Sequence, residues 1–233
     1  MRIDIGWLRE WQTLAAASVA LIAAIVAFQN TSRSLRHSER LETRRRNRKH
    51  AAVRAVLPLA LAQVSDYAER SARALDSLVK KCIDELLPPM TATEDIIQRL
   101  PSETLRTLSE FIEYSDSVET RLIEETVAWI QIQDSRLRGL LDDNRDPSEP
   151  RLTLKTEIQG RIIDAASIYA GASAGFEYAR RRQDQLPSTI SWDAVRGALR
   201  NMRFYDDEYP ELHAILNERE KRTKGPFERL RGT

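Results

Sequence analysis

Two kinds of hydrophobic pattern divide this chain, one continuous and one periodic. Leu14 to Phe28 form its only long uncharged apolar run, in which Ser18 is the one polar residue. With Trp11, Gln12 and Thr13 the run reaches eighteen residues, and a helix of that length spans roughly 27 Å at about 1.5 Å per residue. This length just crosses the hydrocarbon core of a bilayer, so the sequence predicts a transmembrane helix at residues 11–30.

The amino side of the run carries two tryptophans one helical turn apart. Amphipathic aromatic rings favour the headgroup layer of a membrane, so this pair fits an interfacial anchor. The predicted anchor residues are Trp7, Trp11, Leu14, Leu21, Ile22, Ile25 and Phe28.

Two other interpretations of the run remain open. A cleaved signal peptide needs a basic start, but Arg2 and Arg9 are balanced by Asp4 and Glu10, and no convincing small-residue cleavage site follows. A buried helix of a soluble domain is the second alternative, because short apolar runs are often core segments. The neighbouring sequence lacks the pattern of a partner for such a helix, which favours the membrane anchor.

The charges on the two sides of the run predict its orientation. Two basic residues precede it and eight follow it before Ala51. Because a basic flank resists translocation, we expect the amino terminus outside and the carboxy-terminal part in the cytoplasm. Within the basic segment, residues 31–50, we expect topology signals or contacts with anionic lipid from Arg33, Arg36, Arg40, Arg44, Arg45, Arg46, Arg48 and Lys49.

Beyond the basic segment, apolar residues recur every three or four positions, and prolines separate these stretches. The pattern predicts an all-α protein with one N-terminal transmembrane helix, then a long kinked helix and a cytoplasmic helical bundle at residues 51–222. Residues 1–10 would be a short extracytoplasmic N-terminus, and residues 223–233 a loose polar tail.

The first long helix is expected to reach Leu87, with a kink or break near Val56 because Pro58 follows. Its apolar stripe would consist of Leu57, Leu61, Val64, Ala68, Leu75, Val79, Ile83 and Leu86.

Further helices are expected from Thr93, from Pro101 to Leu141, from Leu154 to Phe176, and from near Ser191 and Pro210. The polar residues 115–117 predict an irregularity in the second of these, and residues 142–150 a loop after it. Leu152 and Leu154 alternate with polar residues, so a brief strand there is the alternative to helix.

Composition narrows the choice of partners. The formal net charge of +1 combines zero over residues 1–28, +6 over 29–50 (eight basic minus two acidic residues) and therefore −5 over the remainder. The acidic bulk argues against nucleic acid as the target of the main domain. A single cysteine, Cys82, allows no internal disulfide and suits a reducing compartment.

No residue pattern points to a catalytic or metal site. His37, His50 and His213 lack a second ligand at metal-site spacing, and glycine-rich nucleotide motifs are absent from the sequence. We therefore expect no metal and no cofactor. The acidic clusters at 142–143 and 206–208 have a structural explanation at helix ends, and the small residues around 171–175 predict close helix packing.

The residues from Trp11 into the alanine-rich run, the arginine block, and the following segment 51–61 resemble uncharacterised bacterial single-pass inner-membrane proteins. The resemblance covers about the first seventy residues. It implies that the protein lies in a bacterial inner membrane. It implies no activity and no functional residues.

These features lead to one main hypothesis and two alternatives. The main one is a membrane-anchored interaction or regulatory module that binds another protein, another copy of itself or anionic lipid, without catalysis. One alternative is an enzyme whose site, formed by carboxylates or by Arg180, Arg181 and Arg182, exists only in the folded domain. The other is a basic adaptor that tethers nucleic acid at the membrane through residues 40–49.

Overall fold

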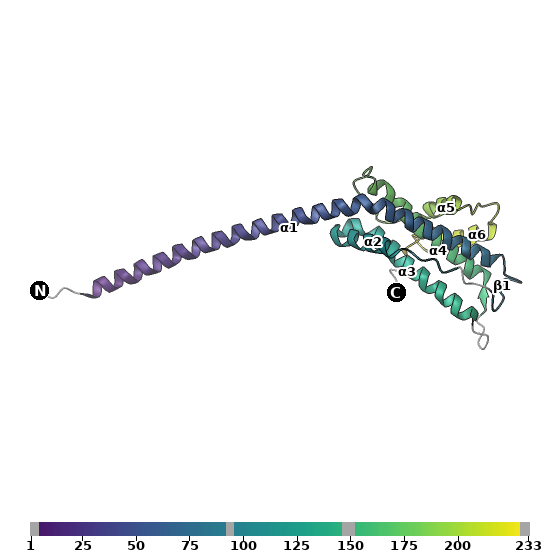
Figure 1. Ribbon diagram of the computed structural model, residues 1–233, viewed down its shortest axis with the longest axis horizontal. Coiled ribbons are helices and arrows are strands. Elements are labelled where there is room, and N and C mark those ends of the chain that lie inside the picture. Colours follow the sequence, from purple (N-terminus) through teal and green to yellow (C-terminus); the bar gives the residue numbers. More distant parts are fainter. Residues whose placement is uncertain (1–4, 92–95, 146–151, 229–233) are drawn as a thin grey trace. The chain divides into compact units, whose positions relative to one another are not determined.

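A computed structural model describes residues 5–91, 96–145 and 152–228, with the backbone alone at 5–27, 117–119 and 145. The described residues form six helices and two short strands (Figure 1). The predicted all-α class is therefore confirmed at the level of a mostly helical chain. The chain divides into two compact units, Met1–Lys49 and His50–Thr233.

The first unit contains the start of α1 (Ile5–Val79). Six predicted anchor residues (Trp7, Trp11, Leu14, Leu21, Ile22 and Ile25) belong to this helix, but their side chains lie outside the described residues. The seventh, Phe28, is 73% exposed. In the part of the chain whose residues are fully described, no helix is both long and apolar enough to cross a bilayer. The transmembrane helix therefore stays a prediction.

In the second unit, α1 presents the predicted apolar stripe to the core. Its members from Leu57 to Leu75 are fully buried, whereas Ile83 is 65% exposed. The helix runs without interruption through Pro58, so of the predicted kink or break the break is wrong, and the kink stays a prediction. Burial of Leu57 and Leu61 on either side of the proline offsets the backbone hydrogen bond that proline removes.

The end of α1 at Val79 corrects the prediction that this helix reaches Leu87. Asp84 and Glu85 have positive φ values of 47° and 65°, which no right-handed helix accommodates. Ile83 and Leu86 exchange two backbone hydrogen bonds of 2.9 Å around this turn. The chain thus reverses where the apolar spacing alone suggested a continuing helix.

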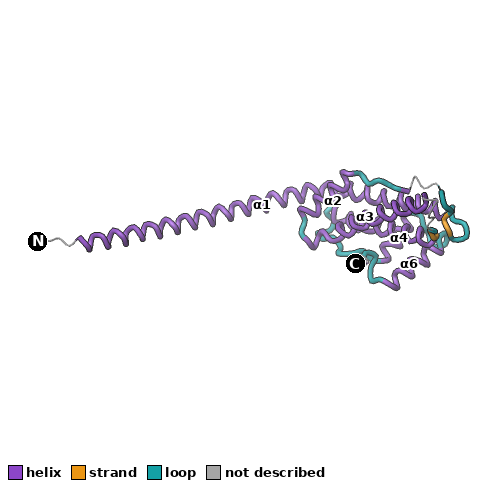
Figure 2. Tube along the Cα trace, turned by 90° about the horizontal axis from the view of Figure 1, so that it is seen from below, coloured by secondary structure: helices purple, strands orange, loops and turns teal. Residues whose placement is uncertain are grey.

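A two-stranded antiparallel ladder follows, formed by β1 (Leu86–Leu87) and β2 (Thr153–Leu154), at one end of the bundle (Figure 2). Leu87 and Thr153 face each other and are buried, whereas Leu154 is 45% exposed. The strand that the alternation of Leu152 and Leu154 allowed is therefore present, ahead of the helix.

The next two helices are α2 (Ser102–Tyr114) and α3 (Ser117–Arg145). The predicted irregularity at 115–117 is confirmed as the break between them, where Ser115 adopts an extended backbone. Because α3 continues to Arg145, the predicted loop begins later than residue 142. The short helix predicted from Thr93 begins outside the described residues.

The centre of the bundle is α4 (Lys155–Ala179), which packs against α3 and against two later helices, α5 (Trp192–Asn201) and α6 (Pro210–Arg222). Sixteen of its 25 residues are buried. A Cβ atom added at Gly175 would lie 2.9 Å from Leu61 Cδ1, and one at Gly171 would lie 2.6 Å from Thr126 Oγ1. The close packing expected around these glycines is confirmed.

The predicted loose tail is wrong for residues 223–228. Phe227 is 1% exposed, and its ring lies 5.8 Å from that of Trp129. The indole nitrogen of Trp192 donates to the carbonyl oxygen of Thr223 at 3.3 Å. One aromatic side chain in a polar segment is enough to attach the segment to the core.

Candidate functional site

The basic segment in the first unit is the site that the sequence singled out. All eight of its basic side chains are exposed. Arg33, Arg36, Arg40, Arg44 and Arg48 follow one another at intervals of three or four residues, which places them along one side of a helix. The other three basic residues extend the charge over the neighbouring faces.

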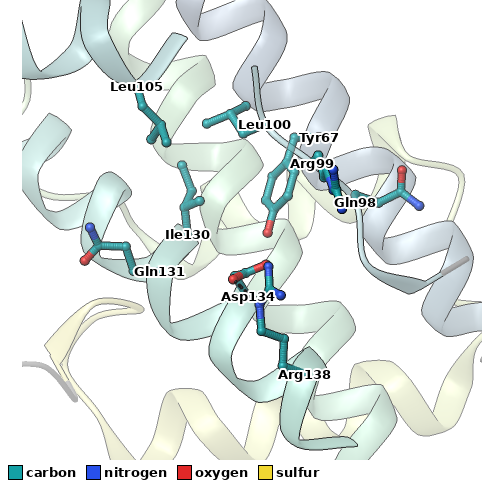
Figure 3. Close-up of a pocket in the computed structure, with 9 residues that line it drawn as sticks. All are labelled: Tyr67, Gln98, Arg99, Leu100, Leu105, Ile130, Gln131, Asp134 and Arg138. Atoms are coloured by element: carbon teal, nitrogen blue, oxygen red, sulfur yellow. Dashed lines mark hydrogen bonds and ion pairs between the residues drawn. The ribbon is translucent and has the colours of Figure 1, made fainter. Parts of the chain in front are cut away.

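A second candidate site is a cavity of about 320 Å³ in the bundle, which the sequence did not predict (Figure 3). Its apolar wall consists of Leu100, Leu105 and Ile130, which gather on one side of the view. Polar groups line the rest of the cavity: Tyr67, Gln98, Arg99, Gln131, Asp134 and Arg138. The cavity thus combines residues from α1, α2, α3 and the segment before α2.

Tyr67 is the most deeply buried polar residue of this cavity, with 2% of its surface exposed. Its hydroxyl points toward Asp134 in Figure 3 and forms no hydrogen bond with a described residue. Burial raises the pKa of Tyr67 to about 12, and the negative charge of Asp134 adds to the increase. The nearby Ser71 hydroxyl acts in the opposite direction and lowers this pKa by a smaller amount. Tyr67 therefore keeps its proton at neutral pH.

Three charged side chains line the cavity: Asp134, Arg138 and Arg99. Arg138 donates to both oxygens of Asp134, with distances of 2.8 Å from Nε and 3.2 Å from Nη2. Such a two-point pair engages both oxygens of the carboxylate. Arg99 is exposed and makes no ion pair with any residue in the described ranges.

A buried ionic network lies elsewhere in the bundle. The side chain of Asp164 on α4 is 3% exposed and accepts from Arg136 Nη1 at 2.6 Å and from Arg219 Nη1 at 2.7 Å. Arg219 also donates to the carbonyl oxygen of Gly160. The network ties α3, α4 and α6 together. An acidic residue inside the apolar stretch from Ile162 to Ile168 was the signal that could have revealed it.

Beside this network lies a smaller, polar cavity of about 210 Å³. Its lining includes Arg136 and Arg161 together with Asp143 and Glu157. Burial, and then the like charge of Arg136, lower the pKa of Arg161. Acidic and basic groups balance there, so this cavity shows no preference for a ligand of either sign.

The three histidines have different surroundings. His50 Nε2 lies 3.2 Å from the Tyr178 hydroxyl, and His213 Nε2 lies 3.0 Å from the carbonyl oxygen of Phe204. His37 is exposed. Among the residues that the structure describes, no group of three or more His, Cys, Asp or Glu side chains could hold a metal ion.

The other polar clusters considered from the sequence also have local partners. Asp206 lies 3.5 Å from Arg200 and 3.4 Å from His213 Nδ1. Arg180 lies over the ring of Phe176, and Arg182 pairs with Glu177. These contacts give Asp206, Arg180 and Arg182 local partners, and the alternative of an enzyme site stays a prediction.

The fold and these sites define a helical-bundle protein with a basic helical segment and a small internal cavity. No protein-family model matches the chain, and neither a curated protein nor a solved structure is significantly similar to it. Functional inference therefore rests on the residues themselves.

Proposed function

We propose that the chain is a membrane-anchored interaction or regulatory module that acts through binding and not through catalysis. In this proposal residues 11–30 cross a bacterial inner membrane, the amino terminus is outside, and the helical bundle lies in the cytoplasm. The observation that carries it is the position of eight exposed basic side chains directly after the one apolar run.

The basic residues divide by their distance from the apolar run. Arg33 is five residues past Phe28, or about 8 Å along a helix, whereas Lys49 is twenty-one residues past it, or about 30 Å. The Debye length at physiological ionic strength is about 8 Å. The residues nearest Phe28 would therefore act on the membrane and set topology, and the more distant ones would be available to another anionic surface.

Membrane anchoring is tested with Ile22→Lys, which places a charge in the middle of the apolar run. A central charge costs about 3 kcal/mol on insertion, so we expect the full chain to move from the membrane fraction to the soluble fraction. Gln29→Lys adds the same charge just after the run and should leave the chain in the membrane. Equal fractionation of the two variants would contradict the anchor.

Orientation is tested by replacing all eight basic residues with Gln and comparing reporters active on only one side of the membrane. We expect mixed orientation, because Arg2 and Arg9 would then dominate the flank charge. The matched control is Glu39→Gln with Glu42→Gln, which makes the segment more basic and should keep the bundle inside. An unchanged orientation after the eightfold replacement would overturn the charge argument.

The binding role is tested by affinity capture of the full chain in mild detergent. A specific partner should be recovered with the wild-type chain and lost with Leu61→Asp, because Leu61 is fully buried and its replacement unfolds the bundle. A partner retained by that variant would belong to the first unit and not to the bundle.

A further inference from the structure

We propose that two copies of the chain associate in parallel through α1, as a short coiled coil that begins in the apolar run and extends into the basic segment. The proposal rests on the membrane-anchored function proposed above, because a shared membrane gives two copies the same direction. The contact surface, or seam, consists of the large residues Trp7, Leu14, Leu21, Phe28 and Leu35 and the smaller residues Ala17, Ala24, Thr31 and Ser38.

The seam follows a repeat of seven residues. Large apolar residues occupy every seventh position from Trp7 to Leu35, and a small residue stands three positions after each of the last four. In an uninterrupted helix this repeat keeps the positions on one side when two helices supercoil. α1 meets that condition, since it runs without a break from Ile5 to Val79. The small residues allow two backbones to approach closely.

The seam is exposed where its side chains are described. Phe28 is 73% exposed and Leu35 is 60% exposed. Single exposed apolar residues are common, but these two continue the spacing of the run before them. Val56 and Leu59, in the second unit, stand twenty-one and twenty-four positions after Leu35 and so keep the same repeat by sequence. Of the five large apolar residues exposed on the described part of α1, only Leu41 departs from it.

The arginines nearest the run lie away from the seam. Arg33 and Arg40 are two positions before Leu35 and five positions after it, which places both about 140–160° around the helix from Leu35. Two copies can therefore join their seams while these cations remain outside and available to anionic lipid. The seam ends at residues 42–49, where charged residues occupy positions 42, 45 and 49 of the repeat.

A second copy is the occupant that this pattern selects. A heptad seam fits a helix with the same repeat, and in a parallel pair each position meets its own equivalent. Leu35 then meets Leu35, and Ser38 meets Ser38. Copies in one membrane are already aligned and have a high effective concentration, so an interface smaller than the standard one between soluble proteins is sufficient.

The test is oxidative disulfide cross-linking of the full chain in lipid vesicles, with Cys82→Ala to remove the native thiol and one new cysteine in each variant. Helix axes about 8–10 Å apart place the Cα atoms of facing seam positions roughly 5 Å apart, which a disulfide can join, and those on the outer sides roughly 13–15 Å apart. Leu35→Cys and Ser38→Cys should therefore form a dimer at least about tenfold faster than the outer variants Arg33→Cys and Arg40→Cys.

The amount of each variant in the vesicle fraction is measured in the same samples. A chain that enters the vesicles and cross-links equally fast at seam and outer positions contradicts the seam and leaves the anchor intact. A chain that does not enter them contradicts the membrane anchor, and with it the shared membrane on which the pairing depends.

A matched pair of leucines tests the energy of the contact. Leu35→Ala and Leu41→Ala each remove an exposed leucine from the basic segment, but only Leu35 belongs to the seam. Energy transfer between copies labelled at Thr233→Cys in the Cys82→Ala chain, titrated against the protein-to-lipid ratio, measures association. Leu35→Ala should weaken association about tenfold and Leu41→Ala less than about twofold. Equal effects of the two substitutions, or no effect of Leu35→Ala, would overturn the proposal.

Discussion

Arg54 on α1 donates two hydrogen bonds to the carbonyl oxygen of Tyr178 on α4, at 3.0 Å from Nε and 2.7 Å from Nη2. The guanidinium also lies 3.8 Å from the centroid of the Tyr178 ring, and Nη2 donates to the carbonyl oxygen of Gln183 at 2.8 Å. A single cation thus binds carbonyls at and beyond the C-terminal end of α4, where the helix dipole favours positive charge. This contact joins two helices through residues that are 124 positions apart in sequence.

Residues 50–233 should fold as an independent, mostly helical domain, and Arg54→Ala in this fragment should lower the free energy of unfolding by about 2 kcal/mol. The loss follows because two carbonyl oxygens lose a charged donor. Urea unfolding followed by circular dichroism measures it. Arg70→Ala removes an exposed arginine of the same helix and should change stability by less than about 0.5 kcal/mol. A spectrum dominated by strand would contradict the domain assignment.

Leu61→Asp should unfold this domain, whereas Leu59→Asp should leave it folded. The two positions lie on the same helix, but Leu61 is fully buried and Leu59 is 67% exposed. An unpaired charge in the core costs more than about 4 kcal/mol, which is a large part of the stability of a typical domain. Thermal unfolding distinguishes the two variants. A stable Leu61→Asp variant would show that the wrong face of α1 had been assigned to the core.

Gly171→Ala should lower the free energy of unfolding, whereas Gly139→Ala should raise it. At Gly171 the added methyl group would lie 2.6 Å from Thr126 Oγ1 and 3.2 Å from Phe227, so we expect a loss of about 1–3 kcal/mol. At Gly139 on α3, nothing lies within 4 Å of the added atom. There the alanine should stabilise the helix by about 0.5–1 kcal/mol. Parallel urea titrations give both values, and equal signs would refute the packing described for α4.

Asp164→Asn should lower stability by about 3 kcal/mol, because Arg136 and Arg219 would lose their shared buried counter-charge. Asp66→Asn is the matched control. Asp66 forms an exposed pair with Arg70 one turn away, and this type of pair contributes about 0.3–0.5 kcal/mol. A double variant that also changes Arg136 to Met should recover part of the loss, which a thermodynamic cycle would quantify.

The domain should lose stability as the pH rises from about 10 to about 12, and Tyr67→Phe should remove part of this loss. The pKa of Tyr67 is raised from 10.0 to about 12 in the folded chain. Above pH 10 the unfolded state releases the tyrosine proton while the folded state retains it, so alkali favours unfolding. The contribution is about 2 kcal/mol. Urea midpoints across this pH range measure it, and the exposed Tyr205→Phe variant should follow the wild type.

The local spacing of apolar residues was sufficient to predict most of the helices. Three- and four-residue spacing identified the buried face of α1 from Leu57 to Leu75. The helix predicted from near Ser191 is α5, and the Ser191 hydroxyl caps it by accepting from the Ala194 amide. Both features depend on residues within one or two turns of each other. Periodicity could therefore detect them without any knowledge of tertiary contacts.

The same reasoning failed where a distant segment competes with local preference. Val79, Ile83 and Leu86 continue the helical spacing, yet Leu86 pairs with Leu154, sixty-eight residues later, and the chain leaves the helix. Pro58 predicts a break that burial of the surrounding leucines overrides, and Phe227 is buried by contacts with Trp129 and Gly171 on other helices.

What the sequence determined by itself was the helical class, the position of the apolar run and the basic residues that follow it. These properties are carried by neighbouring residues and by net charge, which are independent of the fold. The cavity was decided by tertiary structure alone, because Tyr67, Arg99, Leu105 and Asp134 come from segments that approach one another only when α1, α2 and α3 pack. The unpaired hydroxyl of Tyr67 is likewise a property of that packing, since a tyrosine in an unfolded chain bonds to water.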